Sequence, residues 1–259
     1  MKSIKLKIAK IIIELSSEKG KIDFPQGSAH KNFVVEDGKP HLSLKAYYGT
    51  IPDIPLGEEL FNSKSVWRLY SKGNSLIFTL TSQQNSKKPY SIAVLDKDFK
   101  RGEIYIDLPE LSSYIPNPLD YPLDELLMVG ILSRGKGILV HSSCIDDRGL
   151  GMLFTGTSGA GKSTMAQVWS GKEGVKLLTD ERAIVRKEGK NFFAYGTPWH
   201  GTANIHSPAR VCLKKIFFIK HGKENHARVL DKIDSASRLI VRAFPTYWDT
   251  EGMKFTLDL

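Results

Sequence analysis

The sequence predicts an α/β protein in which a phosphate-binding core follows a β-rich N-terminal domain. Residues 156–164 read GTSGAGKST and fit the phosphate-binding loop pattern G-x-x-x-x-G-K-[ST]. A short apolar run at residues 150–155 precedes this loop, and a segment with helical character follows it. The first 115 or so residues contain apolar runs separated by turn signals, which is typical of strands.

The N-terminal half is expected to consist mostly of strands. Ile4, Leu6 and Ile8 alternate with lysines, so one face of a strand would be buried and the other solvated. Further strands are expected at residues 67–70, 75–80 and 90–95, with turns at 37–38, 72–74 and 101–102. No chemical motif is visible in this half, and its aromatic residues are interpreted as core.

A proline-rich stretch marks the expected domain boundary. Pro116, Pro118 and Pro122 lie close together, and proline removes a backbone donor and interrupts regular structure. The sequence is therefore divided into a β-rich N-terminal domain, residues 1–118, and a nucleotide-binding domain, residues 119–259.

The second half is expected to alternate strands with a few helices. A helical apolar pattern spans residues 124–132. A hairpin is expected to turn at residues 146–149 and to lead into the phosphate-binding loop. After the loop we expect helices at 164–169 and 235–243, and strands at 175–179, 183–186, 191–195 and 215–219.

The loop residues are the expected nucleotide site. Glycine lets backbone N–H groups converge on an anion, and the helix that follows adds unpaired N–H groups and the positive end of its dipole. Lys162 would reach the outer phosphates, and the Ser163 hydroxyl would hold Mg²⁺. The alternative is a flexible glycine loop before a basic helix. The nucleotide-binding prediction covers Gly156, Thr157, Ser158, Gly159, Ala160, Gly161, Lys162, Ser163 and Thr164.

A pair of acids follows the apolar run at 175–179. Asp180 and Glu181 come 17 residues after Ser163, and a strand that ends in an acid can place a carboxylate beside the Mg²⁺ of such a loop. The predicted metal ligands are therefore Ser163 and Asp180. The alternative is a solvated turn in which the acids pair with Arg182.

Two further features are weaker signals. His141 lies on the strand that would run antiparallel to the one ending in the loop, which would bring it near the transferred phosphate; it could equally be a packed or surface residue. Residues 196–202 (GTPWHGT) are expected to form a shaped loop whose Trp199 and His200 would line a pocket; the alternative is a plain surface loop with one buried tryptophan. Arg210, Lys214 and Lys215 are available cations, and the sequence does not choose among them.

The bulk composition sets few limits. The net charge of +9 comes from scattered basic residues, and no nucleic-acid-binding motif accompanies them, so a nucleic-acid role is not expected. Cys144 and Cys212 are too few for a disulfide framework and are expected in the core. The run Ile11–Ile13 is too short for a membrane span, so a cytoplasmic protein without membrane partners is expected; a homo-oligomer is left open.

Three elements together resemble the HPr kinase/phosphorylase superfamily, in particular its HPr-serine-kinase-like relatives. They are His141 in an apolar strand, the loop that starts 15 residues later, and the apolar run into Asp180 and Glu181. The resemblance covers residues 120–220 well. It implies a P-loop kinase-like core related to phosphoenolpyruvate carboxykinases, with ATP and Mg²⁺ as ligands. It also implies that Lys162 contacts phosphates, that Asp180 acts as or next to the general base, and that His141 lies in the catalytic pocket.

The sequence departs from the family pattern at two points. Glu181 stands where the regulatory enzymes carry Asp, and the arginine–glycine signature of the phosphorylase activity is not visible. The expected function is transfer of the γ-phosphate of ATP to a hydroxyl on a protein, peptide or small-molecule acceptor, with His141, Lys162, Asp180 and Glu181 as catalytic residues. The alternatives are a nucleotide-binding regulatory protein without catalysis and a carboxykinase-like lyase.

Overall fold

The structure is a computed structural model that describes residues 2–17, 22, 24–82, 88–109 and 115–259. The chain folds as two compact units. The first contains Met1–Lys7, Ile11–Ser28 and Val34–Ile131; the second contains Ile8–Lys10, Ala29–Phe33 and Leu132–Leu259. Because the units exchange short segments, no single cut separates them, and the division between residues 118 and 119 stays a prediction about domains.

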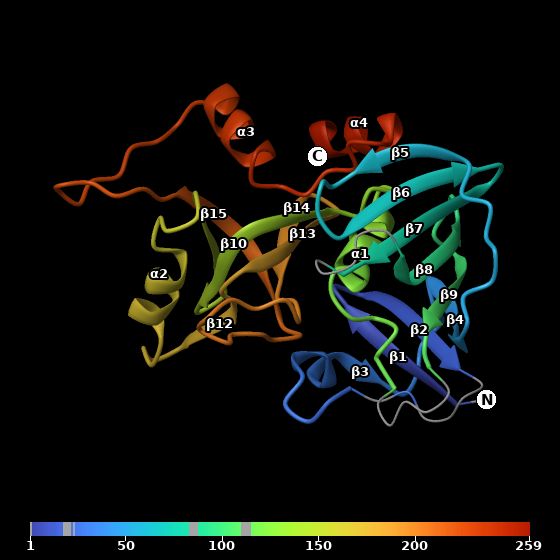
Figure 1. Ribbon diagram of the computed structural model, residues 1–259. Coiled ribbons are helices and arrows are strands. Elements are labelled where there is room, and N and C mark those ends of the chain that lie inside the picture. The colour runs from blue at the N-terminus through green and yellow to red at the C-terminus, as the bar shows by residue number, and fades with distance from the viewer. Residues whose placement is uncertain (1, 18–21, 23, 83–87, 110–114) are drawn as a thin grey trace. The chain divides into compact units, whose positions relative to one another are not determined.

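The first unit is built on a nine-stranded sheet with the order β3-β1-β2-β4-β9-β8-β7-β6-β5 (Figure 1). The predicted strands at 4–8, 67–70, 75–80 and 90–95 are confirmed as parts of β1, β6, β7 and β8. Its elements are β1 (Lys2–Ile8), β2 (Ile11–Ser17), β3 (Val34–Val35), β4 (Leu42–Gly49), β5 (Glu58–Asn62), β6 (Trp67–Lys72), β7 (Ser75–Thr81), β8 (Pro89–Asp96), β9 (Arg101–Asp107) and most of α1 (Leu123–Leu132).

The turn predicted at residues 101–102 is wrong, because β9 begins at Arg101. The chain turns earlier, where the carboxylate of Asp96 accepts hydrogen bonds from the backbone amides of Asp98, Lys100 and Arg101. Side chains of Asp commonly replace a backbone acceptor in this way at turns. Gly102 is needed inside the strand, since an added Cβ would lie 2.8 Å from the carbonyl oxygen of Val94.

The second unit contains a six-stranded sheet that closes on itself. β10 pairs with β11, β11 with β15, β15 with β14, β14 with β13, and β13 again with β10, while β12 joins the remaining part of β10. The elements are β10 (Ile138–Asp147), β11 (Leu150–Thr155), α2 (Lys162–Trp169), β12 (Val175–Thr179), β13 (Arg182–Glu188), β14 (Asn191–Tyr195), β15 (Arg210–Phe218), α3 (Lys232–Ile240), α4 (Thr250–Asp258) and the short helix η1 (Ala29–Phe33).

The predicted α/β class, with a P-loop kinase-like core of the HPr kinase/carboxykinase type, is wrong. The described chain is 41% strand and 17% helix, and it consists of a large sheet and a closed sheet. An α/β core needs parallel strands joined through helices. Within the six-stranded sheet only β11 and β15 are parallel, and β12 after helix α2 pairs antiparallel with β10 rather than parallel with β11. The strands predicted in this unit and the predicted hairpin of β10 and β11 are present, whereas β2, β4, β5, β9 and α4 were not predicted, and α3 ends at Ile240 rather than at residue 243. The pairing of β12 with β10 was not predicted.

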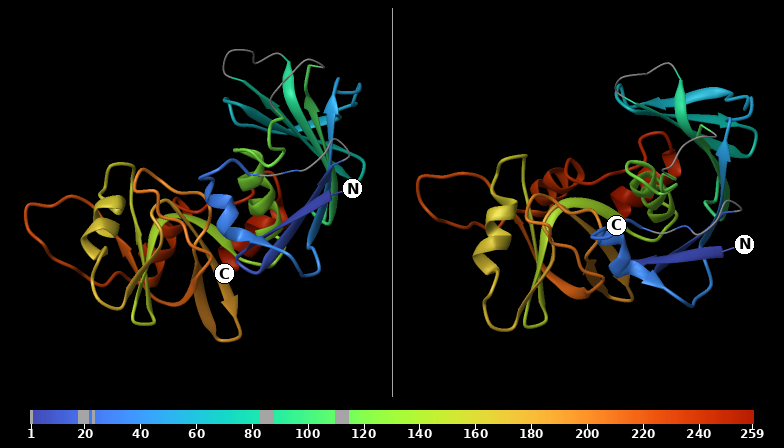
Figure 2. Two further views of the ribbon diagram at one scale, coloured as in Figure 1. Left: turned by 90° about the horizontal axis from the view of Figure 1, so that it is seen from below. Right: turned by 60° about the horizontal axis from the view of Figure 1, so that its bottom comes forward.

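The helix after the loop is held by the outer face of the closed sheet. Ile145, Met152 and Phe154 form a buried cluster, and Met165 and Trp169 of α2 pack against it. The ring of Phe154 stacks on that of Phe217, with centroids 5.0 Å apart. This packing fixes the start of α2, and with it the end of the phosphate-binding loop. Both turned views show α2 alongside the strands of this unit (Figure 2).

Replacing Gly196 with alanine is expected to destabilise the second unit. A Cβ at this position would overlap the carbonyl oxygen of Ser207 and lie 2.5 Å from that of Leu178. Backbone atoms cannot move aside as a flexible side chain can, so we expect a loss of roughly 1–3 kcal/mol in chemical denaturation. The control is Gly189→Asn, in a turn with open space and a φ of 60°, which asparagine tolerates. Equal stability of the two variants would contradict this account.

Candidate functional site

The predicted phosphate-binding loop connects β11 to α2. The hydroxyl of Thr155, the last residue of β11, donates a hydrogen bond to the carbonyl oxygen of His141 (2.8 Å). Gly156 passes so close to the neighbouring strand that a Cβ would lie 2.6 Å from the carbonyl oxygen of Ile219. Gly161 has a φ of 97° and precedes the first turn of the helix. The close approach at Gly156 and the positive φ of Gly161 both favour glycine, which explains the spacing of these residues in the motif.

The N-terminus of α2 has no side-chain cap among the described residues. The first N–H groups of the helix are therefore left for a ligand. Lys162 is only 7% exposed, and its Nζ donates to the carbonyl oxygens of Gly156 (3.4 Å) and Thr157 (3.2 Å). Burial lowers the pKa of Lys162, as does nearby Arg242, while Glu181 opposes this change. The lysine therefore lies folded over the loop, next to the space a phosphate would occupy.

Asp180 is fully buried at the end of β12. Its carboxylate accepts hydrogen bonds from the backbone amides of Gly201 (2.9 Å), Ala203 (2.9 Å) and Ile205 (3.3 Å). The loop wraps so tightly that a Cβ on Gly201 would lie 2.9 Å from Oδ2 of Asp180. Both carboxylate oxygens are thus engaged with the loop that follows β14.

Glu181 points to a different set of partners. Its Oε1 lies 3.3 Å from Nε2 of His141 and 3.2 Å from the guanidinium of Arg182. The hydrogen bond from His141 lowers the pKa of Glu181, against the effect of burial, and the charges of Arg182 and Lys162 lower it further. Glu181 is therefore held as a carboxylate between a histidine and the phosphate-binding loop.

His141 lies at the point along β10 where the hydrogen-bonded partner changes on both edges of the strand, here called the junction. On one edge β12 ends at Thr179 and β13 begins at Arg182, so the acid pair falls between them. The Ser142 amide donates to the carbonyl of Glu181 (2.9 Å). On the other edge β11 ends at Thr155.

The other edge of this junction is completed by a segment after α3, which the sequence had not suggested as part of the site. The amide of His141 donates to the carbonyl of Arg242 (2.8 Å), and Val140 bridges to Ala243. The segment was missed because it is about 100 residues from His141 and carries no motif. The one sequence signal for this segment is Arg242 near the end of an amphipathic helical pattern, and arginine is too common there to identify a site.

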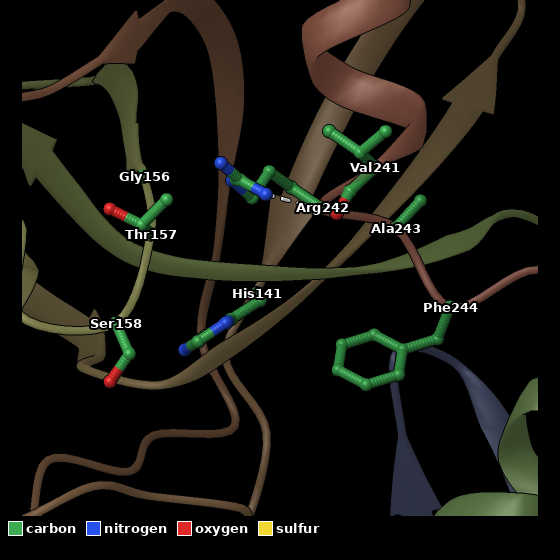
Figure 3. A pocket seen from close by; sticks show the side chains of 8 residues that line it. All are labelled: His141, Gly156, Thr157, Ser158, Val241, Arg242, Ala243 and Phe244. Carbon is green, nitrogen blue, oxygen red and sulfur yellow. Dashed lines mark hydrogen bonds between the residues drawn. The ribbon is translucent and has the colours of Figure 1, made fainter.

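An open pocket of about 380 Å³ lies at this junction. Figure 3 shows the side chains of His141 and Arg242 directed toward the side formed by Thr157 and Ser158, with Phe244 at the opposite side. The guanidinium of Arg242 donates to the carbonyl of Val241 (3.3 Å). The lining residues are His141, Gly156, Thr157, Ser158, Val241, Arg242, Ala243 and Phe244. A polar, cationic half thus faces an apolar half.

Other residues considered from the sequence lie away from this cavity. Arg210 pairs with Glu188 at 2.7 Å. Phe218 pairs with Thr155, so the end of β15 that lies beside the phosphate-binding loop is Phe218. Arg210 lies at the other end of β15, eight residues earlier and about 26 Å away along the strand. Lys214 and Lys215 are exposed on the same strand. In the 196–202 loop, Trp199 is buried and His200 is exposed.

Three general findings bear on function. No cluster of three or more His, Cys, Asp or Glu side chains suited to a metal ion occurs in the described part of the chain. Among the same residues, none of the helices combines the length and apolar character needed to cross a membrane. No protein-family model matches the chain, and comparison with curated proteins gives no match. The function must therefore be argued from the site itself.

Replacing His141 with alanine is expected to raise the pKa of Glu181. The variant removes the main cause of the lowered pKa and leaves the effect of burial, which raises it. In the wild type the ionised carboxylate contributes stability above its unfolded pKa near 4.5, and this contribution is lost as the pH falls through the lower folded value. The measurement is the ¹³C NMR titration of the carboxyl group in chelator-treated protein.

Glu188 is the internal control for this titration. Burial acts to raise its pKa, but hydrogen bonds from Lys10, Tyr195 and Arg210 outweigh it and bring the pKa to about 2. None of these partners changes in the variant, so the Glu188 signal should titrate as before. An unchanged Glu181 titration in the variant would show that His141 does not act on this carboxylate.

Proposed function

We propose that this chain binds MgATP at the 156–164 loop and transfers the γ-phosphate to a hydroxyl acceptor in the adjoining cavity. The proposal rests on one observation: the loop lysine, the Glu181–His141 pair and Arg242 converge on the first residues of a phosphate-binding loop. It needs only this local strand–loop–helix arrangement, not the α/β core that was predicted. The local sequence resemblance to HPr-serine-kinase-like proteins supports the same reaction class.

The residues at the loop suit a nucleotide polyphosphate with its magnesium ion. The amides at the start of α2 would bind phosphate oxygens, and Lys162 would exchange its loop carbonyl partners for the outer phosphates. Ser163 follows directly and would supply a hydroxyl ligand to Mg²⁺, with an acid as a second ligand. When bound, the magnesium ion would neutralise phosphate charge.

The reaction needs a group that takes the proton of the acceptor hydroxyl. The acceptor oxygen would form a bond to the γ-phosphorus while the bond from that phosphorus to the β,γ-bridging oxygen breaks, so ADP leaves. The hydroxyl proton would pass to the carboxylate of Glu181, which His141 orients through its Nε2. The lowered pKa of Glu181 makes this carboxylate a weak base that is better suited to orienting the hydroxyl. Orientation is sufficient for a loose transition state, in which little proton transfer is needed.

The two acids would then have different roles. Asp180 is held by three backbone amides and would mainly shape the loop around the acid pair, although its predicted role as a metal ligand stays a prediction. Glu181 contacts His141 and would act on the acceptor. Arg242 and Lys162 would offset the charge that develops on the transferred group.

A second candidate is a nucleotide sensor without transfer. The observation that favours it is the complete burial of Asp180, because its oxygens are already engaged by the protein. Under this alternative the loop would still bind MgATP, but no phosphate would move to an acceptor. The kinase and the sensor would both bind MgATP, but only the kinase would transfer phosphate to an acceptor.

Lys162→Ala is expected to lower phosphoryl transfer at least roughly 100-fold, as the loss of a charge-stabilising donor does in other enzymes. The measurement is transfer of labelled γ-phosphate from MgATP into a cell extract split into protein and small-molecule fractions. The control is Lys190→Ala, an exposed lysine in the turn between β13 and β14. Wild-type turnover in Lys162→Ala would contradict the proposal, and MgATP binding without transfer by the wild type would favour the sensor.

Glu181→Gln and Asp180→Asn are expected to fail in different ways. Glu181→Gln should bind MgATP but lose transfer, because the proton acceptor is gone, and its loss of stability should be smaller than that of Asp180→Asn. Asp180→Asn would place an amide group against backbone N–H donors and should cost about 1–3 kcal/mol of unfolding free energy. Calorimetry of nucleotide binding, thermal unfolding and labelled transfer would separate the two. A transfer-competent Glu181→Gln would reassign the proton acceptor.

A further inference from the structure

The segment between β15 and α3 is an unusually long connection. Residues 219–231, here called the basic arm, contain no helix or strand, and residues 220–229 are all exposed. The arm extends away from the strands of the second unit in each view (Figures 1 and 2). Connections of this length without secondary structure are uncommon in compact domains and are usually functional or disordered.

The basic arm begins at the tip of the phosphate-binding loop. The amide of Ile219 donates to the carbonyl of Thr155 (2.8 Å), so the arm leaves the sheet where the loop does. Two residues later, Nε2 of His221 lies 2.8 Å from the carbonyl oxygen of Gly159; because a carbonyl can only accept, the histidine donates. The first end of the arm is therefore hydrogen-bonded to the middle of the loop.

The segment formed by the basic arm, α3 and residues 241–244 also ends beside the phosphate-binding loop. The arm runs into α3, and α3 runs into residues 241–244, which line the cavity opposite Thr157 and Ser158. The amide of Phe244 donates to the carbonyl of Leu139 (3.0 Å), which fixes this second end to β10. The two ends thus bracket the loop, one at Gly159 and the other beside residues 156–158.

The side chains of the arm match a polyphosphate. Lys220, Lys223 and Arg228 are exposed cations. Glu224 and Asp231 are the acids of the arm, so the arm is net positive even with its histidines neutral. Val229 is 99% exposed, an apolar side chain that closure of the arm would cover. A nucleoside triphosphate presents three phosphate groups to these cations, whereas a monophosphate presents one.

We propose that the basic arm is a further nucleotide-binding element, which closes over the polyphosphate of a bound nucleoside triphosphate and favours it over the monophosphate. The inference rests on the proposed nucleotide site. The anchored ends act as hinges, and Lys220, Lys223 and Arg228 bind the phosphates from the side opposite the loop amides.

Limited proteolysis with trypsin tests closure directly, since trypsin cuts after Lys223 and Arg228. Cleavage at these two sites is followed by mass spectrometry with no nucleotide, with AMP, and with the magnesium complex of a non-hydrolysable ATP analogue. We expect the analogue to slow cleavage at least about tenfold and AMP to have little effect, because protection scales with the population of the open form. The same analogue should not protect the arm of Lys162→Ala at concentrations that this variant does not bind.

Calorimetry on the same samples separates the two proposals. Binding of the analogue without protection of the arm would overturn the inference and leave the nucleotide site standing. No binding at all would overturn the proposed function and this inference with it. Binding and protection without phosphoryl transfer would support the arm and overturn catalysis.

A charge variant provides the second measurement. Lys220→Gln/Lys223→Gln/Arg228→Gln should weaken analogue binding roughly tenfold at low salt and much less at high salt, since exposed charges are screened. The matched control Lys187→Gln/Lys190→Gln/Lys214→Gln removes the same charge from strands and a turn away from the loop and should bind normally. Equal affinity of both triple variants would overturn the role of the arm.

Discussion

The site depends on the hydrogen bonding of one strand, β10. Its first half pairs with β13 on one edge and with residues 242–244 on the other; its second half pairs with β12 and β11. Both edges therefore change partner near His141. Each change of partner leaves a short piece of chain out of the ladder, and these pieces carry Glu181, Arg242 and the start of the phosphate-binding loop. A shift of register in β10 would separate all of them at once.

Electrostatics at this junction are consistent with a site for a polyanion. Lys162 is buried, Arg242 and His141 face the same cavity, and Glu181 is the carboxylate held among them. Concentrating cations in one place costs free energy in the empty protein, because like charges repel and burial removes water. Such an arrangement is usual at functional sites, where a ligand of opposite charge offsets the cost. Asp180 takes no part in this balance at the cavity surface, since backbone amides surround it.

The strands that were predicted are each encoded locally, whereas β2, β4, β5 and β9 were not identified from the sequence. Alternation in β1, the apolar runs of β7 and β8, and the turn before β11 all appear in short windows of sequence. The overall class could not be predicted in the same way. A strand, a glycine loop and a helix at residues 150–169 are compatible with a parallel α/β core and with the closed sheet found here. The choice depends on whether β12 pairs with β11 or with β10, which is a long-range contact without a local signature.

The sequence by itself determined the strand, glycine loop and helix at residues 150–169, because each is encoded in one short segment. It also identified the acid pair and His141 as candidates, since each lies at the end of, or within, a recognisable apolar run. Only the tertiary structure decided which acid faces His141, because adjacent side chains at a strand end point in opposite directions and the backbone amides of Gly201, Ala203 and Ile205 bind Asp180. Only the tertiary structure brought Arg242 and the basic arm to the loop, because hydrogen bonds to β10 and β11 hold segments that are far apart in the chain.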